Sequence, residues 1–188
     1  EGIKATKTKK ALPILSFPAT QLMGITVREL IADSERQAEG IRLIAARNDA
    51  YAANSLMDLS VEAECFGAQI RFSDDEIPTV IGSCIDGYEQ AAALRVPEVG
   101  CGRTGIYVDA IHKAAVTITD RPVFGCTIGP FSLAGRLVGV TDAMIKCYEE
   151  PETVHLLLEK ATEFIIAYCL AYKQAGANGT ALAEPLAG

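Results

Sequence analysis

Arg121-Pro-Val-Phe-Gly-Cys-Thr-Ile-Gly-Pro130 is the stretch that decides the fold. Residues 121–127 are the clearest candidate for a buried central strand, and the turn Ile128-Gly-Pro130 leads into a helix expected to begin at Phe131. Further on, the longest helical pattern starts at Pro151 and ends at Gly176, and a strand follows it directly. A strand, a helix and a second strand in this order predict a right-handed crossover and a mainly parallel sheet.

The last eleven residues, Asn178-Gly-Thr-Ala-Leu-Ala-Glu-Pro-Leu-Ala-Gly188, are interpreted as this second strand, which brings Glu184 to its C-terminal end. No helical pattern follows to cover the strand. A closed (β/α)8 barrel usually takes about 250 residues, whereas a doubly wound sheet can be complete in the 188 residues given. We expect residues 1–188 to form a single domain with about four parallel strands, as the front part of a larger α/β enzyme.

The sequence upstream alternates in the same way between helical and extended patterns. Thr26-Val-Arg-Glu29 has the form of a capping box that starts one of the helices. The elements expected upstream are a helix over 26–46, a strand over 49–57, a short helix over 59–66, a hairpin over 68–81, a helix over 86–94, a glycine-rich loop over 99–105 and a helix over 106–118.

Composition excludes several classes of protein. The formal net charge is −7, and no long apolar run is present, so the sequence indicates neither a nucleic-acid-binding surface nor a membrane span. The six cysteines lack the paired spacing of a zinc site or a disulfide framework. Small buried cysteines of this kind are typical of a reduced protein in the cytoplasm.

Two of the strand ends carry carboxylates that are candidates for catalysis. Asp58 follows Met57 at a strand-to-helix junction, where it either caps the next helix or faces a ligand together with Met57. Glu184 follows an apolar strand, and a carboxylate partly removed from water suits proton transfer. The carboxyl ends of parallel strands meet at one edge of a sheet, where α/β proteins bind their ligands.

The third junction, Thr127-Ile-Gly-Pro-Phe-Ser-Leu-Ala-Gly-Arg136, is a candidate for substrate binding. Gly129 permits close approach to the backbone, and Ser132 and Arg136 lie one turn apart at the start of the new helix. A helix N-terminus with these residues favours an anionic group, although a turn of this form is also common as a structural element. We therefore expect Asp58, Ser132 and Glu184 to converge near one end of the sheet.

No residue is assigned to a metal. His112 and His155 fall within helical patterns, far apart and without a cysteine two positions away. The acidic turn Ser73-Asp-Asp-Glu76 lacks the alternating ligand spacing of a calcium loop.

Three separated blocks nevertheless resemble one family, the uroporphyrinogen decarboxylase superfamily. These blocks are Ser55-Leu-Met-Asp-Leu-Ser-Val-Glu-Ala-Glu-Cys-Phe-Gly-Ala-Gln-Ile-Arg-Phe72, Pro122-Val-Phe-Gly-Cys-Thr-Ile-Gly-Pro-Phe-Ser-Leu-Ala134 and Gly176-Ala-Asn-Gly-Thr-Ala-Leu-Ala-Glu-Pro185. The resemblance implies a (β/α)8 TIM barrel, present here as a partial barrel of about half. It also implies one of two reactions: metal-free decarboxylation of a tetrapyrrole, or zinc-dependent methyl transfer between a corrinoid and a thiol.

Residues within the resemblance favour the methyl-transfer branch. The decarboxylases carry an arginine-rich stretch near the N-terminus that holds substrate carboxylates, whereas the corresponding Leu15-Ser-Phe-Pro-Ala-Thr-Gln-Leu-Met-Gly24 has no arginine. Asp58 matches the decarboxylases' central carboxylate, but Arg136 stands where they keep a tyrosine. The chain therefore resembles the methylcobamide:coenzyme M methyltransferases.

On this resemblance the protein is a methyltransferase that moves a methyl group from a methylated corrinoid to a thiol such as coenzyme M. Its zinc is held by a His-x-Cys pair and a later cysteine that have no counterpart in residues 1–188. Zinc ligands are thus expected outside this segment, which alone is expected to be inactive. The partners implied are a corrinoid protein or free methylcobalamin, and a small thiol; an open sheet edge also predicts self-association as a homo-oligomer. The alternatives are uroporphyrinogen decarboxylase and a non-catalytic module that binds a tetrapyrrole or a corrinoid protein.

Overall fold

The main sheet of the protein is parallel. A computed structural model describes residues 9–187, and its main sheet contains β1 (Ala53–Asn54), β4 (Val123–Ile128) and β5 (Gly179–Ala183) in the order β1-β4-β5. Phe124 pairs with Asn54 on one side and with Gly179 on the other. The predicted α/β class and the central position of the 121–130 stretch are therefore confirmed.

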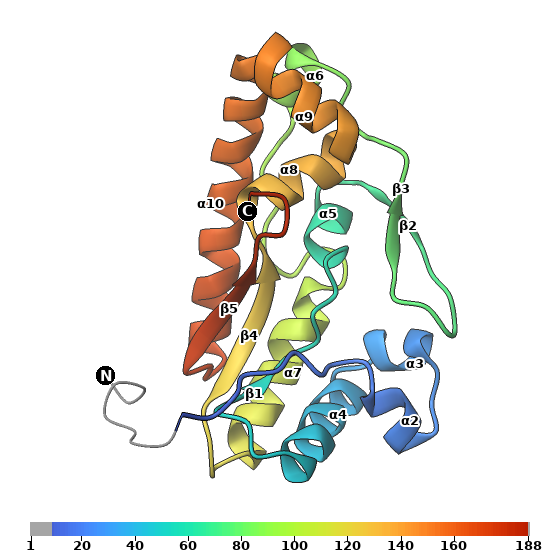
Figure 1. The fold of residues 1–188 in the computed structure, drawn as a ribbon, viewed down its shortest axis with the longest axis vertical. Helices are drawn as coiled ribbons and strands as arrows, with labels where there is room; N and C mark the ends of the chain where they lie inside the picture. Colours follow the sequence, from blue (N-terminus) through green and yellow to red (C-terminus); the bar gives the residue numbers. More distant parts are fainter. Residues whose placement is uncertain (1–8, 188) are drawn as a thin grey trace.

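The predicted helices and the second, smaller sheet follow the expected chain order, and the structure adds two helices that were not predicted, over 19–23 and 140–149 (Figure 1). The small sheet is the predicted hairpin, in which β2 (Gln69–Arg71) and β3 (Thr79–Ile81) pair in antiparallel fashion. The helices are α2 (Ala19–Met23), α3 (Val27–Ile31), α4 (Ser34–Arg47), α5 (Val61–Cys65), α6 (Tyr88–Ala93), α7 (Thr104–Thr117), α8 (Pro130–Val138), α9 (Val140–Glu149) and α10 (Pro151–Gln174).

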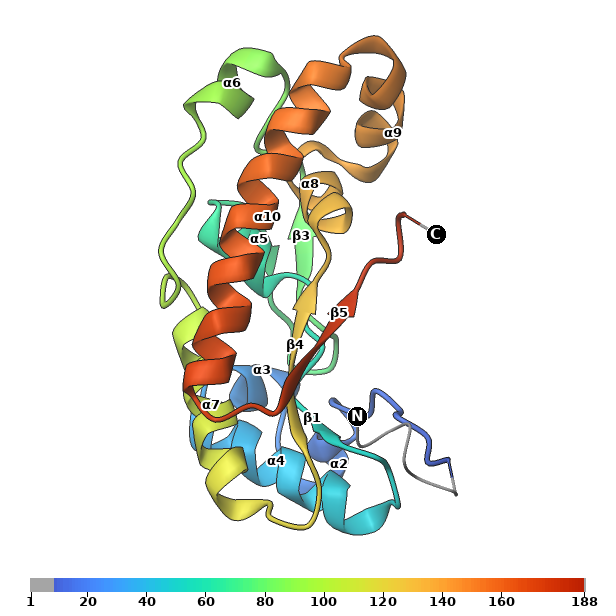
Figure 2. The same cartoon turned by 90° about the vertical axis from the view of Figure 1, so that its left-hand side faces the viewer.

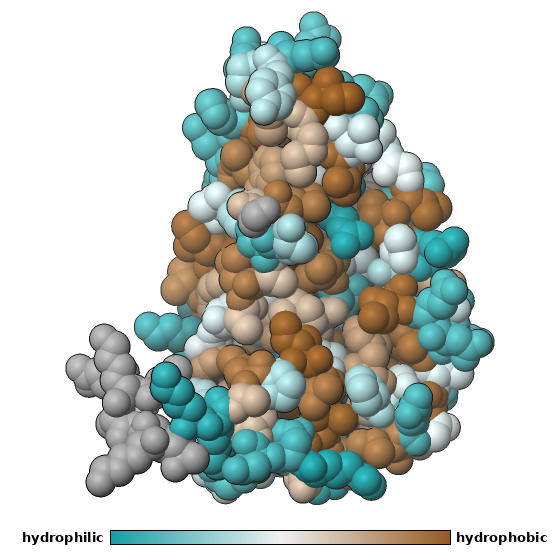
Figure 3. Space-filling view, in the orientation of Figure 1, coloured by the Kyte–Doolittle hydropathy of each residue, from teal (hydrophilic) through white to brown (hydrophobic). Residues whose placement is uncertain are grey.

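Helices cover one face of the main sheet. Helices α7 and α10 lie along one side of the strands (Figure 2), and α10 approaches β4 closely at Gly125, where an added Cβ would lie 2.5 Å from Cδ2 of the buried Tyr172 ring. Hydrophobic residues also gather over β4 and β5 on the face that Figure 3 shows. Leu182 of β5, which is 49% exposed, lies instead on the α10 side, in a groove with Ile166 and Leu170. The self-association expected from the sequence would depend on this apolar face and on the edge of β5.

The structure corrects two details of the predicted N-terminal elements. The helix expected over 26–46 is two helices, because Asp33 adopts an extended conformation and its side chain caps α4 by accepting a hydrogen bond from the backbone of Arg36. The strand expected over 49–57 is limited to two residues. Beyond it, the Ser55 hydroxyl oxygen replaces the backbone as the acceptor for the N–H of Cys126, so the ladder ends there. Only three parallel strands, rather than about four, occur within residues 9–187.

Within the same residues, no helix combines the length and the apolar character that crossing a membrane requires.

Candidate functional site

The carboxylate of Glu184 binds the N-terminus of α8. It accepts hydrogen bonds from the backbone N–H of Phe131 (2.9 Å) and of Ser132 (2.8 Å), and a third from the Ser132 hydroxyl. Glu184 stands directly after β5, and the N–H of Gly129 donates to the carbonyl of Ala183 at the end of that strand. The helix N-terminus that the sequence marked as an anion site thus holds the chain's own carboxylate.

Gly129 is the residue that allows this arrangement. An added Cβ there would lie 2.8 Å from Cβ of Glu184 and still closer to its carboxylate. The glycine therefore leaves space for the acid between two neighbouring strand ends. The structure brings Ser132 and Glu184 together, as expected. Asp58, the third position expected to converge with them, bonds other residues instead.

Asp58 is the centre of a second cluster, in which every acceptor position of its carboxylate is used. Oδ2 accepts from Arg103 (2.5 Å) and from the Tyr107 hydroxyl (2.9 Å). Oδ1 accepts from the backbone N–H of Ser60 (3.0 Å) and from its hydroxyl (2.6 Å). A carboxylate has about four lone-pair sites, and the Asp58 side chain is 0% exposed. Asp58 therefore has no acceptor site left for a further donor.

Arg103 holds this cluster together from the start of α7. Its Nε donates to Glu64 (2.7 Å), its Nη2 to the Ser60 hydroxyl (2.9 Å), and its guanidinium stands over the Phe72 ring at 5.1 Å from the centroid. Burial opposes the charge on Arg103, but Asp58, Tyr107 and Glu64 outweigh that effect and raise its pKa. Nothing in the sequence singles out Arg103, although the glycine-rich loop over 99–105 that contains it was expected.

Glu62 lies between the two clusters. One of its carboxylate oxygens accepts from the Thr127 hydroxyl (2.8 Å) and from the backbone N–H of Ile128 (3.1 Å), next to Gly129. Its other oxygen has no partner among the described residues. Burial is the main reason that the pKa of Glu62 rises to about 7, and the nearby Asp58 charge adds to the rise. Glu62 thus positions the turn that carries Ser132.

We expect a Glu62→Gln substitution to remove a pH-dependent loss of stability. The pKa of Glu62 is about 7 in the folded chain against 4.5 for the free side chain, so the folded state binds more protons between these values. The free energy of unfolding therefore falls as pH rises through that window, by up to about 3 kcal/mol. Glutamine keeps the acceptor for Thr127 and Ile128 without the charge. The free energy of unfolding of the variant should therefore increase relative to that of the parent protein as pH rises.

Urea unfolding at about pH 5 and about pH 8 measures this difference. Glu163→Gln, on the exposed side of α10, is the control and should change stability by less than about 0.5 kcal/mol at either pH. If the free energies of unfolding of the Glu62 variant and the parent protein differed by the same amount at both pH values, the raised pKa assigned to Glu62 would be contradicted.

Neither Met57 nor Arg136 is joined to either cluster by a side-chain hydrogen bond or an ion pair within residues 9–187. The backbone N–H of Met57 donates to the Ser16 hydroxyl at 3.0 Å. Arg136 is half-buried in α8 and makes no ion pair within residues 9–187. The structure therefore joins Gly129, Ser132 and Glu184 in one cluster and places Asp58 in another.

The zinc implied by the resemblance has no fitting set of ligands in the described part of the chain. No three side chains of histidine, cysteine, aspartate or glutamate come together there as a metal site requires. His112 lies on α7, where Nδ1 is 3.3 Å from the carbonyl of Ala175, and His155 lies on α10.

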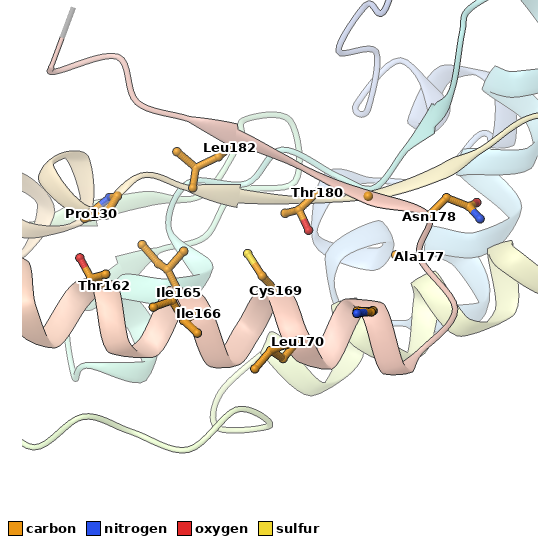
Figure 4. A pocket seen from close by; sticks show the side chains of 12 residues that line it. Pro130, Thr162, Ile165, Ile166, Cys169, Leu170, Ala177, Asn178, Thr180 and Leu182 are labelled. Atoms are coloured by element: carbon orange, nitrogen blue, oxygen red, sulfur yellow. The ribbon is translucent and has the colours of Figure 1, made fainter. Parts of the chain in front are cut away.

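An apolar groove of about 530 Å³ lies elsewhere, between α10 and β5 (Figure 4). Ile166 and Leu170 of α10 line it together with Leu182 of β5, and each is about half exposed. It contains no carboxylate, although Pro130, next to Gly129, also lines it.

A family model and the sequences of known proteins both match this chain. The family model described as Uroporphyrinogen decarboxylase (URO-D) matches residues 10–188. Methylcobamide:CoM methyltransferase MtbA of Methanosarcina acetivorans is 32% identical over 133 residues, which are 69% of this chain and 39% of that protein. Uroporphyrinogen decarboxylase of Hydrogenovibrio crunogenus is 26% identical over 179 residues, which are 92% of this chain and 50% of that protein.

The fold is also that of a solved structure. A methyltransferase from Methanosarcina mazei superposes with a TM-score of 0.87 at 23% identity, over 99% of this chain and 57% of that one. The α/β fold, with its parallel sheet, is consistent with part of a TIM barrel. The chain matches half or less of the length of these curated relatives.

Proposed function

The chain belongs to the uroporphyrinogen decarboxylase family, and from this premise we propose that the protein transfers a methyl group from a methylated corrinoid to a thiol such as coenzyme M. Relatives of both branches match the chain, and the names of the methyltransferases state that they act on a methylcobamide and coenzyme M. The choice between the branches depends on the residues at the strand ends.

The state of Asp58 is the observation that carries the proposal. A porphyrinogen presents four pyrrole N–H donors, and a carboxylate can accept them only where its acceptor positions are free. Here Asp58 is buried, and its four acceptor positions are filled by Arg103, Tyr107 and Ser60. Releasing it would break the buried ion pair between Asp58 and Arg103, which is costly. We therefore assign Asp58 to positioning rather than to tetrapyrrole binding.

The absence of arginine in the 15–24 stretch agrees with this assignment. An octa-acid substrate requires several guanidinium partners, and Arg103 is already engaged by Asp58 and Glu64. A substrate with fewer carboxylates suits this surface better.

We assign direct substrate contact to the Glu184 cluster. Glu184 is half-buried and is fixed by three donors from α8. Its carboxylate therefore keeps a constant position and does not have to reorganise during a reaction. Gly129 and Ser132 shape the same surface, and Met57 and Arg136 would border the corrinoid or the thiol. The chemistry that zinc supplies in this branch is activation of the thiol as a thiolate; we expect its ligands outside residues 9–187.

The proposal is tested with the protein at the full length that its gene encodes. With methylcobalamin and coenzyme M under anaerobic conditions, we expect the methylcobalamin absorbance to be lost and the methylated thiol to appear in equal amount. A parallel reaction receives uroporphyrinogen and is analysed for CO₂ and for decarboxylated products. Decarboxylation without methyl transfer would assign the protein to the other branch, and activity with neither substrate would contradict the proposal.

A further inference from the structure

Two cysteines outside the strand-end clusters lie side by side. The Cys65 thiol, at the end of α5, donates to the carbonyl oxygen of Cys101 at 2.8 Å. The Cys101 thiol in turn is 3.9 Å from the carbonyl oxygen of Cys65. Each sulfur thus lies beside the backbone of the other residue, so the two side chains are neighbours where α5 meets the glycine-rich loop.

The loop that contains Cys101 is shaped to fit against α5. Gly100 and Gly102, on either side of Cys101, have φ angles of +106° and +53°, a conformation that favours glycine. A Cβ on Gly102 would already be in van der Waals contact with the Cys65 sulfur, at 3.7 Å. The Cys101 carbonyl also accepts a hydrogen bond from the Thr104 hydroxyl at 2.6 Å. The position of Cys101 is thus fixed by its neighbours.

The two thiols differ in access. Cys101 is exposed, whereas Cys65 is 9% exposed. Burial is the main reason that the pKa of Cys65 rises to about 12, and the adjacent Cys101 thiol adds to the rise. An exposed thiol beside a buried one is the arrangement in which the first reacts with a small reagent and the second resolves the product.

We propose that Cys65 and Cys101 are a redox-responsive pair that forms a disulfide and locks the glycine-rich loop onto α5. This site is separate from the proposed methyl transfer and does not depend on it. The loop carries Arg103, which binds Glu64 and Asp58, so the cross-link joins the two chain segments of the Asp58 cluster covalently.

The chemistry balances with a small-molecule disulfide as the oxidant. The Cys101 thiolate attacks one sulfur of this disulfide, so that a mixed disulfide forms and one thiolate leaves. The Cys65 thiolate then attacks the Cys101 sulfur and releases the second thiolate. The protein loses two electrons and two protons, and the oxidant becomes two thiols.

Peptide mapping tests the pair in the full-length protein. The reduced protein is treated with oxidised glutathione, free thiols are blocked, and the sample is digested with trypsin without reduction. Cys65 falls in the tryptic peptide 48–71 and Cys101 in 96–103, and each peptide has one cysteine. We expect these two peptides to be linked, and the link to disappear in Cys65→Ser and in Cys101→Ser but not in Cys84→Ser, whose thiol contacts Leu137 instead.

The rate at which Cys65 attacks the mixed disulfide on Cys101 gives an independent readout. Because the Cys65 thiol must lose its proton, conversion of the mixed disulfide to the cross-link should speed up about tenfold per pH unit below its pKa. The linked protein should also unfold at a higher temperature than the reduced one. A mixed disulfide that stays on Cys101, a link from Cys101 to another cysteine, or no reaction at Cys101 would each overturn the proposal.

Discussion

Replacement of Arg103 by alanine is expected to lower the free energy of unfolding by about 3–5 kcal/mol. The substitution leaves the Asp58 carboxylate buried without a charge partner, and it also removes a donor from Glu64. An uncompensated buried charge costs far more than the loss of an ordinary hydrogen bond. Urea unfolding of the full-length protein, followed by circular dichroism, measures the change.

Arg28→Ala is the matched control. Arg28 also pairs with an aspartate, Asp74, but both side chains are more than half exposed. Such a pair contributes at most about 1 kcal/mol. If both arginine variants lost similar small amounts of stability, Asp58 would not be a closed buried site, and the assignment of its role would fail.

A Gly129→Ala substitution is expected to lower methyl transfer by the full-length protein about 100-fold. The added methyl group would occupy the space of the Glu184 side chain, so the carboxylate must leave the three donors at the N-terminus of α8. Displacement by about 1 Å is enough for an effect of this size when a group has to be positioned for reaction. Initial rates with methylcobalamin and coenzyme M give the comparison.

Gly87→Ala supplies the control because Gly87 is likewise the N-cap of a helix, α6. A Cβ there would come no closer than 4.0 Å to another residue, and we expect the rate to stay near that of the parent protein. Full activity in Gly129→Ala, with the fold retained, would exclude Glu184 as a positioned substrate contact.

The sequence predicts the parts of the site that are local. The strand over 121–127, its glycine-proline turn and the apolar run before Glu184 each carry their own signal, and these three segments form the Glu184 cluster. The elements also follow in the expected order. A parallel sheet then brings Ser132 and Glu184 together, although they lie 52 residues apart.

The parts that depend on long-range partners are not visible in the sequence. Arg103 lies 45 residues from Asp58, and nothing near either residue shows that the two pair. Glu62 belongs to an acidic helix, Val61–Cys65, that suggests a solvated surface, yet packing against β4 buries it. The position of Asp58 at a strand end therefore predicts a carboxylate available to a ligand, whereas in the structure tertiary contacts fill its acceptor sites.

Equilibrium binding decides most directly whether the strand ends accept a corrinoid or a porphyrinogen. The full-length protein is dialysed anaerobically against labelled methylcobalamin, first alone and then with excess uroporphyrinogen. Because Arg103 occupies the Asp58 carboxylate, we predict that methylcobalamin is retained and that uroporphyrinogen does not displace it. Retention of uroporphyrinogen, with methylcobalamin left unbound, would contradict the assignment to methyl transfer.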